Sequence, residues 1–167
     1  MTESRLLIDV SEKVPEVAWT NHFVYQDARG SFAEAFRTSE AREVRGFHVA
    51  QVNVANNLSG VLRGMHVHRH QFDYWYVASG FVQAAVHKGD AWETRILSPG
   101  HGVVIPPTTY HGFLSLTTSV VLEGVSREYD LLEPDEDGYY PYSGPVIWSL
   151  PEKDTILSLR DKGAKLW

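Results

Sequence analysis

Three histidines and one aspartate in the middle of this 167-residue sequence have the spacing of groups that act together: His66, His68, Asp73 and His111. The first three lie in the pattern G-x5-H-x-H-x4-D-x6-G, and the fourth ends the pattern G-x5-P-x4-H. Residues two apart on a strand point to the same face, so His66 and His68 are expected to share a face. We expect Asp73 on the next strand of the hairpin and His111 on a strand across the barrel. Imidazole and carboxylate groups that converge in this way can bind a divalent metal or move protons.

A metal is one of two interpretations of this spacing. If the protein is metal-dependent, the expected ligands are His66, His68, Asp73 and His111. The same spacing fits metal-free barrels, in which histidines at a strand end are solvated or hydrogen-bonded. We therefore expect no cofactor and keep the metal site as the alternative.

Short strands are the elements that must position these residues. Residues 47–53 alternate, with 47, 49, 51 and 53 on one face. Further runs rich in β-branched residues, separated by Gly, Pro, Asp or Asn, lie at 81–87, 92–97, 102–105 and 119–125. Helices are expected only around 39–44 and near the C-terminus. The pattern predicts an all-β fold, a sandwich or barrel with few short helices.

Composition limits the class of protein. A chain of 167 residues has room for one domain, and we predict that residues 1–167 form a single domain. The sequence contains no Cys, which excludes disulfides, thiolate metal sites and Cys nucleophiles. Acid–base chemistry must therefore use imidazole, carboxylate or phenol groups.

Charge and hydropathy restrict the partners. A net charge of −6 argues against nucleic acid and anionic membranes, but not against a single diphosphate bound by arginines. The N-terminus has no basic region followed by a long apolar core, and no stretch approaches the ~18–20 apolar residues of a membrane span. We expect a cytoplasmic protein with no nucleic-acid or membrane partner.

Six short segments, in this order, resemble the dTDP-4-dehydrorhamnose 3,5-epimerase family, a cupin branch that acts on nucleotide-linked 4-keto-6-deoxy sugars. They are residues 27–34, 51–53, 60–66, 111–113, 147–148 and 156–161. The histidine and glycine spacing likewise resembles the paired motifs of cupin barrels, with Asp73 for the usual Glu. The resemblance implies a cupin-type jelly roll. It also implies an epimerase of a dTDP-4-keto-6-deoxyhexose in deoxysugar biosynthesis, acting at C3, C5 or both.

An acid–base pair is implied by the same resemblance. A modest base can remove hydrogen from a carbon next to a ketone if its pKa lies near the working pH, and histidine meets that condition. By resemblance His66 is this base and Asp161 is its partner, with His68 and Tyr129 as further catalytic candidates. Without the family, Asp161 would be interpreted as a surface carboxylate in a charged tail.

Four residues are implied to bind the nucleotide and the sugar. Guanidinium groups offer forked donors that match phosphate, so Arg29 and Arg63 are expected on the diphosphate, with an ion pair to a nearby carboxylate as the alternative. Amide side chains suit a pyrimidine edge or a sugar hydroxyl, which is the role expected of Gln51 and Asn53. A buried-amide role is the alternative for this pair.

Three further contacts, and a homodimer, follow from the resemblance. Phe32 and Glu34 would contact the base and the ribose, and His111 would contact phosphate or the keto-sugar. In the family this early segment serves a neighbouring subunit. The resemblance therefore implies a homodimer with sites shared between subunits.

Two positions depart from the family pattern. Counting back from Gly80 puts Asp73 where the family has a lysine. The family has a proton-donating tyrosine about thirteen residues beyond the histidine that corresponds to His111. Ungapped counting reaches Gly124 there, and Tyr129 matches a second family tyrosine. Double inversion at C3 and C5 thus lacks its expected donor.

His68 leaves other functions open. Epimerases commonly have Gln at this position, whereas Arg-Gly-x-His-x-His resembles the dTDP-4-keto-6-deoxyglucose 3,4-ketoisomerases. Besides the epimerase, three functions stay open: a ketoisomerase, a metal-dependent cupin enzyme and a non-catalytic sugar-nucleotide binder.

Overall fold

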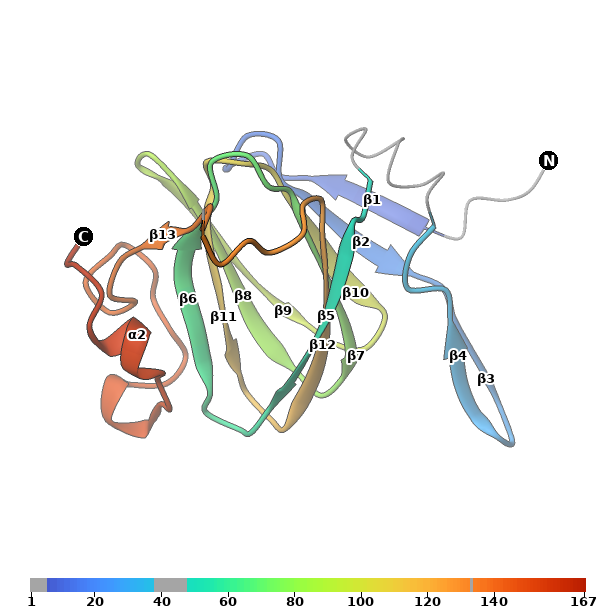
Figure 1. Cartoon of the computed structure of the whole chain (residues 1–167). Helices are drawn as coiled ribbons and strands as arrows, with labels where there is room; N and C mark the ends of the chain where they lie inside the picture. The colour runs from blue at the N-terminus through green and yellow to red at the C-terminus, as the bar shows by residue number, and fades with distance from the viewer. Residues whose placement is uncertain (1–5, 38–47, 133) are drawn as a thin grey trace.

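Nearly every regular element is a strand in this computed structural model, which describes residues 6–37, 48–132 and 134–167 (Figure 1). A six-stranded antiparallel sheet has the order β1 (Leu6–Val10), β2 (Ala18–His22), β10 (His101–Ile105), β7 (Asp73–Ser79), β12 (Ser119–Val125) and β5 (Gln51–Asn57). A five-stranded antiparallel sheet has the order β13 (Asp137–Gly138), β6 (Leu62–Val67), β11 (Tyr110–Ser115), β8 (Val82–Lys88) and β9 (Ala91–Leu97). A separate hairpin contains β3 (Val24–Asp27) and β4 (Gly30–Ala33). No helix in the described ranges is long and apolar enough to cross a membrane.

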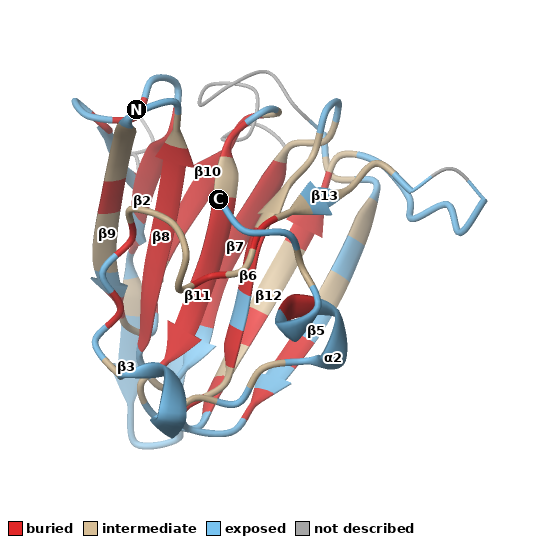
Figure 2. Cartoon of the chain, turned by 90° about the vertical axis from the view of Figure 1, so that its left-hand side faces the viewer, coloured by how far each residue is buried: buried red, intermediate tan, exposed pale blue. Residues whose placement is uncertain are grey.

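The main core lies between the two large sheets (Figure 2). Val77 and Ile105 from the six-stranded sheet pack there with Val86 from the five-stranded sheet, and all three are fully buried. The central strands β7 and β8 are buried along almost their whole length because their outer faces are covered too. Close packing on both faces gives the cavity described below rigid walls.

The C-terminal segment covers the outer face of the five-stranded sheet. Trp148 packs there against Leu62 and Leu114. The segment continues through the 3₁₀ helix η1 (Glu152–Asp154) to the short helix α2 (Leu159–Lys162), which lies beside β6 (Figure 1). The last residues of the chain are thereby brought to a strand that lies about a hundred residues earlier.

The all-β prediction is confirmed, and the runs at 81–87, 92–97, 102–105 and 119–125 correspond to β8, β9, β10 and β12. The start predicted for the run 47–53 is wrong at 48–50, which are not in a strand, because β5 begins at Gln51, opposite the point where its partner β12 ends; residue 47 lies outside the described residues. The predicted C-terminal helix is α2. The helix predicted around 39–44 falls outside the described residues.

Two placements predicted from the spacing are wrong. Asp73 and His66 are not on one hairpin, because β6 and β7 belong to different sheets. His111 is not across the barrel from His66, since β11 pairs directly with β6 and the two histidines are register partners. The connection between β6 and β7 crosses from one sheet to the other, and spacing along the chain does not reveal such a crossing.

Candidate active site

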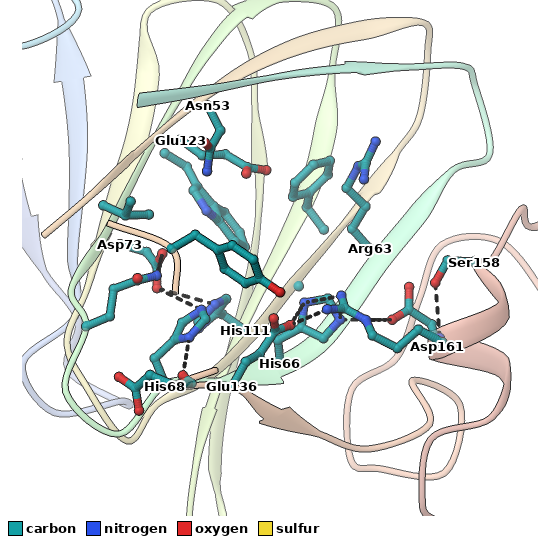
Figure 3. A pocket seen from close by; sticks show the side chains of 18 of the residues that line it. Asn53, Arg63, His66, His68, Asp73, His111, Glu123, Glu136, Ser158 and Asp161 are labelled. Atoms are coloured by element: carbon teal, nitrogen blue, oxygen red, sulfur yellow. Dashed lines mark hydrogen bonds and ion pairs between the residues drawn. The ribbon is translucent and has the colours of Figure 1, made fainter. Parts of the chain in front are cut away.

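A cavity of about 610 Å³ lies between the sheets, and strands of both sheets line it (Figure 3). His66 on β6 and His111 on β11 come from the five-stranded sheet. Asn53 on β5, Asp73 on β7 and Glu123 on β12 come from the six-stranded sheet. The volume suits a small-molecule ligand, and ionisable groups line both walls.

An irregularity in β6 sets which of its residues face the cavity. His66 pairs with His111 and Arg63 pairs with Phe113, so three steps on β6 match two steps on β11. A bulge of this kind shifts the alternation of side chains by one residue. Arg63 and His66 therefore both line the cavity although they are three residues apart.

His66 and Asp161 are in direct contact. Nε2 of His66 lies 2.9 Å from Oδ1 of Asp161, and Asp161 is only 4% exposed. The Ser158 hydroxyl caps α2 by accepting a hydrogen bond from the Asp161 backbone N–H at 3.1 Å, which fixes the helix turn that carries the carboxylate. Burial would raise the pKa of Asp161, but hydrogen bonds and the charge of His66 hold that pKa below its usual value. The carboxylate is thus ionised and can stabilise a positive imidazole.

A second carboxylate lies at the other ring nitrogen. Nδ1 of His66 is 3.3 Å from Oε1 of Glu136, which also pairs with Arg160 Nη1 at 2.8 Å. Arg160 Nη2 lies 2.7 Å from His66 Nε2, where it can donate only while that nitrogen carries no proton. When the ring is doubly protonated, each N–H therefore has a carboxylate acceptor.

Three acceptor atoms, from His68, Asp73 and His111, converge at Asp73. Nδ1 of His68 donates to the Asp135 carbonyl at 2.7 Å, and Nδ1 of His111 donates to the Thr109 carbonyl at 2.9 Å. Each neutral ring therefore presents an Nε2 lone pair. Asp73 Oδ2 lies 3.6 Å from Nε2 of His68 and 3.5 Å from Nε2 of His111, and it has no hydrogen bond within the described residues.

Lone pairs that face one another require a proton or a cation between them. Burial raises the pKa of Asp73 to about 7, and burial also lowers the pKa of His111 well below its usual value. A neutral carboxylic acid at Asp73 can share its proton with either histidine, so protonation is one way to satisfy this cluster.

A divalent cation is the other means of satisfying these three acceptor atoms. One ligand atom from each of His68, Asp73 and His111 lies within 4.8 Å of the others. Ligands about 2.1 Å from an ion at a tetrahedral angle are separated by about 3.4 Å, so the three residues fit such an ion. His66, the fourth predicted ligand, is not in this cluster, because its ring is bonded to Asp161.

The predicted binding residues Gln51, Asn53, Arg63 and His111 all line the cavity. Gln51 Nε2 donates to Asn53 Oδ1 at 2.7 Å, which leaves the Asn53 amide nitrogen for another partner, while the Gln51 oxygen accepts from the Tyr129 backbone N–H. Arg63 Nε donates to Asn57 Oδ1 at 2.7 Å, which orients the guanidinium.

Arg29, Phe32 and Glu34 are not brought to this cavity by their own chain. They lie on or next to the β3–β4 hairpin, which projects away from the sheets (Figure 1). Arg29 pairs with Asp27 at 2.5 Å with a side chain 90% exposed, and Phe32 is 66% exposed.

Tyr129, a predicted catalytic candidate, lines the cavity, and its backbone N–H donates to Gln51 Oε1 at 3.1 Å. The structure also adds residues that the sequence interpretation missed. Glu123 lines the cavity as well, whereas Gly124 points to the outer face, where an added Cβ would lie 3.2 Å from Val49. The alternation of residues 119–125 could have predicted this, because Glu123 is two residues from Val121 and therefore shares its inward face. Glu136 and Arg160 had no such local signal.

Known proteins are similar to this chain in sequence. The family model for dTDP-4-dehydrorhamnose 3,5-epimerase matches residues 11–167. The spore coat polysaccharide biosynthesis protein SpsL of Bacillus subtilis is 27% identical over 126 residues, which is 67% of this chain and 80% of that protein.

Solved structures are similar as well. The dTDP-6-deoxy-D-glucose-3,5-epimerase of Legionella pneumophila, in complex with dTDP-4-keto-L-rhamnose, is 25% identical with a TM-score of 0.85, covering 96% of this chain and 92% of that one. ChmJ, a 3'-monoepimerase of Streptomyces bikiniensis in complex with dTDP-quinovose, is 25% identical with a TM-score of 0.80, covering 92% of this chain and 84% of that one.

The raised pKa of Asp73 predicts a stability that falls as pH rises. Between the unfolded pKa of about 3.9 and the folded pKa of about 7, the folded state binds more protons than the unfolded state. Asp73→Asn cannot ionise, so its thermal midpoint relative to wild type should be higher at pH 8 than at pH 5. Thermal unfolding at both pH values measures this difference. The exposed Asp90→Asn variant should show no such dependence, and an equal loss at both pH values for Asp73→Asn would contradict the prediction.

Proposed function

The chain belongs to the dTDP-4-dehydrorhamnose 3,5-epimerase family, and on that premise we propose that it epimerises a dTDP-linked 4-keto-6-deoxyhexose next to the keto group, at C3, C5 or both. It is an enzyme of the isomerase class. The observation that carries the mechanism is the 2.9 Å contact between His66 and Asp161 at the wall of the cavity. The absence of Cys favours the cytoplasm as the site of this reaction.

Proton removal by His66 begins the proposed reaction. His66 takes a proton from the carbon next to the ketone, and the C–H electron pair moves onto the ketone oxygen to give an enolate. The imidazolium that forms is stabilised by Asp161 on one side and Glu136 on the other. Return of a proton to the opposite face of the carbon completes the inversion.

The nucleotide is proposed to occupy the rest of the cavity. Arg63, oriented by Asn57, supports binding of the diphosphate, because guanidinium donors match phosphate oxygens. Gln51 and Asn53 retain amide groups for the pyrimidine or the sugar, and His111 contacts the sugar or phosphate. The dTDP-sugars in complexes of related proteins support the same ligand class.

We further propose a homodimer in which the β3–β4 hairpin of one subunit serves the cavity of the other. The hairpin extends into solvent and exposes Phe32 and Arg29, side chains suited to stacking on a base and to pairing with phosphate (Figure 1). Glu34 would accompany them at the ribose.

Isotope exchange tests the epimerase. In D₂O with dTDP-4-keto-6-deoxyglucose, the wild-type protein should incorporate deuterium at C3 or C5, followed by NMR. His66→Ala should lower this exchange by about 10²–10⁴-fold, as expected for a general base, while still binding dTDP. The exposed His70→Ala serves as the matched control and should exchange like wild type. Exchange at neither carbon contradicts the proposal, and a 3-keto product would assign a ketoisomerase instead.

Chelation tests the metal alternative. We expect activity to persist after treatment with a chelator, because His66 is held by Asp161 rather than by the His68, Asp73 and His111 cluster. Elemental analysis of protein purified without chelator accompanies the assay. Activity that is lost on chelation and restored by a divalent cation would assign a metal-dependent enzyme.

Subunit complementation tests the shared site. Arg29→Ala and His66→Ala should each be nearly inactive alone. Refolded together, they should form heterodimers in which one cavity has both an intact His66 and the partner's intact Arg29. Activity of the mixture well above the sum of the two variants is expected. A mixture no more active than that sum would show that the hairpin does not serve a neighbouring cavity.

A further inference from the structure

Inversion of a carbon next to a ketone needs proton donors and acceptors on both faces of that carbon. A base that removes a proton from one face restores the original configuration if it returns the proton to the same face. A second group must therefore deliver a proton from the opposite side. The proposed base His66 lies on β6, so the donor is to be sought on the facing wall.

Glu123 lies on that facing wall. It is on β12 of the six-stranded sheet, next to Asn53 of β5 in the strand register. Figure 3 shows Glu123 beside Asn53, away from His66 and Asp161 across the cavity. A ligand between the sheets would have the imidazole on one side and this carboxyl group on the other.

The strand pleat aims Glu123 inward. Val121 on the same strand face belongs to the core between the sheets, and Val125 lines the cavity. Gly124 points outward toward Val49, so a side chain at position 124 would not reach a ligand. Ungapped counting from His111 reaches Gly124, but the residue that faces the substrate space is the one before it, Glu123.

Glu123 is also the carboxyl group left available. The other cavity-lining carboxyl groups that are not exposed are already bonded to protein groups: Asp161 to His66, Glu136 to Arg160, Asp73 to Gln71 and Asp135 to the backbone N–H of His70. The remaining two, Glu128 and Asp130, are exposed. Among the described residues, no hydrogen bond or ion pair holds the Glu123 carboxyl group. Burial raises its pKa, although Arg63 acts in the opposite direction, so the protonated form is populated closer to neutrality than for an exposed glutamate.

We propose that Glu123 is the catalytic acid that protonates the enolate on the face opposite His66; this inference rests on the proposed epimerase function. The Glu123 O–H bond breaks as the new C–H bond forms. The enolate electron pair makes that bond, the C=O double bond is restored, and Glu123 is left as a carboxylate. The imidazolium of His66 then loses its proton to solvent and Glu123 regains one, so the enzyme returns to its starting state. The reverse reaction exchanges the two roles.

Separation of exchange from inversion tests this assignment. Wild type, Glu123→Gln and Glu12→Gln are incubated in D₂O with dTDP-4-keto-6-deoxyglucose, and NMR follows both deuterium in the recovered substrate and the epimerised product. Glu123→Gln keeps the size of the side chain but cannot donate a proton as an acid. It should still exchange the proton that His66 removes, with retention of configuration, while inversion falls by about 10²-fold or more. Glu12→Gln, at an exposed glutamate that does not line the cavity, should behave like wild type.

Three results would overturn the assignment. One is inversion by Glu123→Gln within about threefold of wild type. Another is loss of exchange together with inversion in a Glu123→Gln protein that still binds dTDP, because Glu123 would then act before proton delivery. The third is retained exchange with lost inversion in Tyr129→Phe but not in Glu123→Gln, which would make Tyr129 the acid. Wild-type protein that neither exchanges nor inverts would instead refute the proposed epimerase, and the inference with it.

Discussion

The chemistry of the cavity depends on keeping one carboxylate ionised, that of Asp161, although only 4% of the residue is exposed. A buried charge is costly unless it is paired and hydrogen-bonded, and His66 and the Ser158 cap meet both conditions. The pairing in turn requires a docked C-terminal segment. Gln83, a buried residue of β8, holds that segment by donating to the Ile147 carbonyl at 2.8 Å and accepting from Ser149 N–H at 2.7 Å. An amide in the wall of the barrel thus supports the acid–base pair from a distance.

One cavity holds carboxyl groups in different protonation states because their surroundings differ. Asp161 is hydrogen-bonded to His66 and Ser158, and these hydrogen bonds hold its pKa below the usual value although burial acts in the opposite direction. Asp73 lies beside His68 and His111 in a buried position, and burial raises its pKa to about 7 although His68 acts in the opposite direction. Glu123 has no bonded partner among the described residues, and burial raises its pKa as well. Environments that separate pKa values in this way allow one residue type to act both as a charge stabiliser and as an acid.

Local sequence patterns predict most of the strands, whereas the sheet to which each strand belongs and its register depend on pairing between distant segments. The sequence predicted β8, β9, β10 and β12, because side chains on alternate faces of a strand leave a period of two in the sequence. The placement of Asp73 was wrong because no local pattern indicates which sheet a strand joins. The bulge that turns Arg63 inward arises from the register with β11, fifty residues later. Family resemblance put His66 and Asp161 together, whereas Glu136 and Arg160 join them only through folding of the whole chain.

Helix α2 has consequences for the order in which the molecule assembles. Its four residues form a helix far shorter than the ~12–15 residues that an isolated helix needs in water, so it exists only where the barrel supports it. The carboxylate it carries belongs to a contact spanning 95 positions of sequence, so closing it costs more loop entropy than a local contact does. Local opening of the C-terminal segment would separate the pair while the two sheets remain folded. The free energy of unfolding the two sheets therefore differs from the free energy of separating His66 from Asp161. Hydrogen exchange of the α2 amides would measure the separation of the pair.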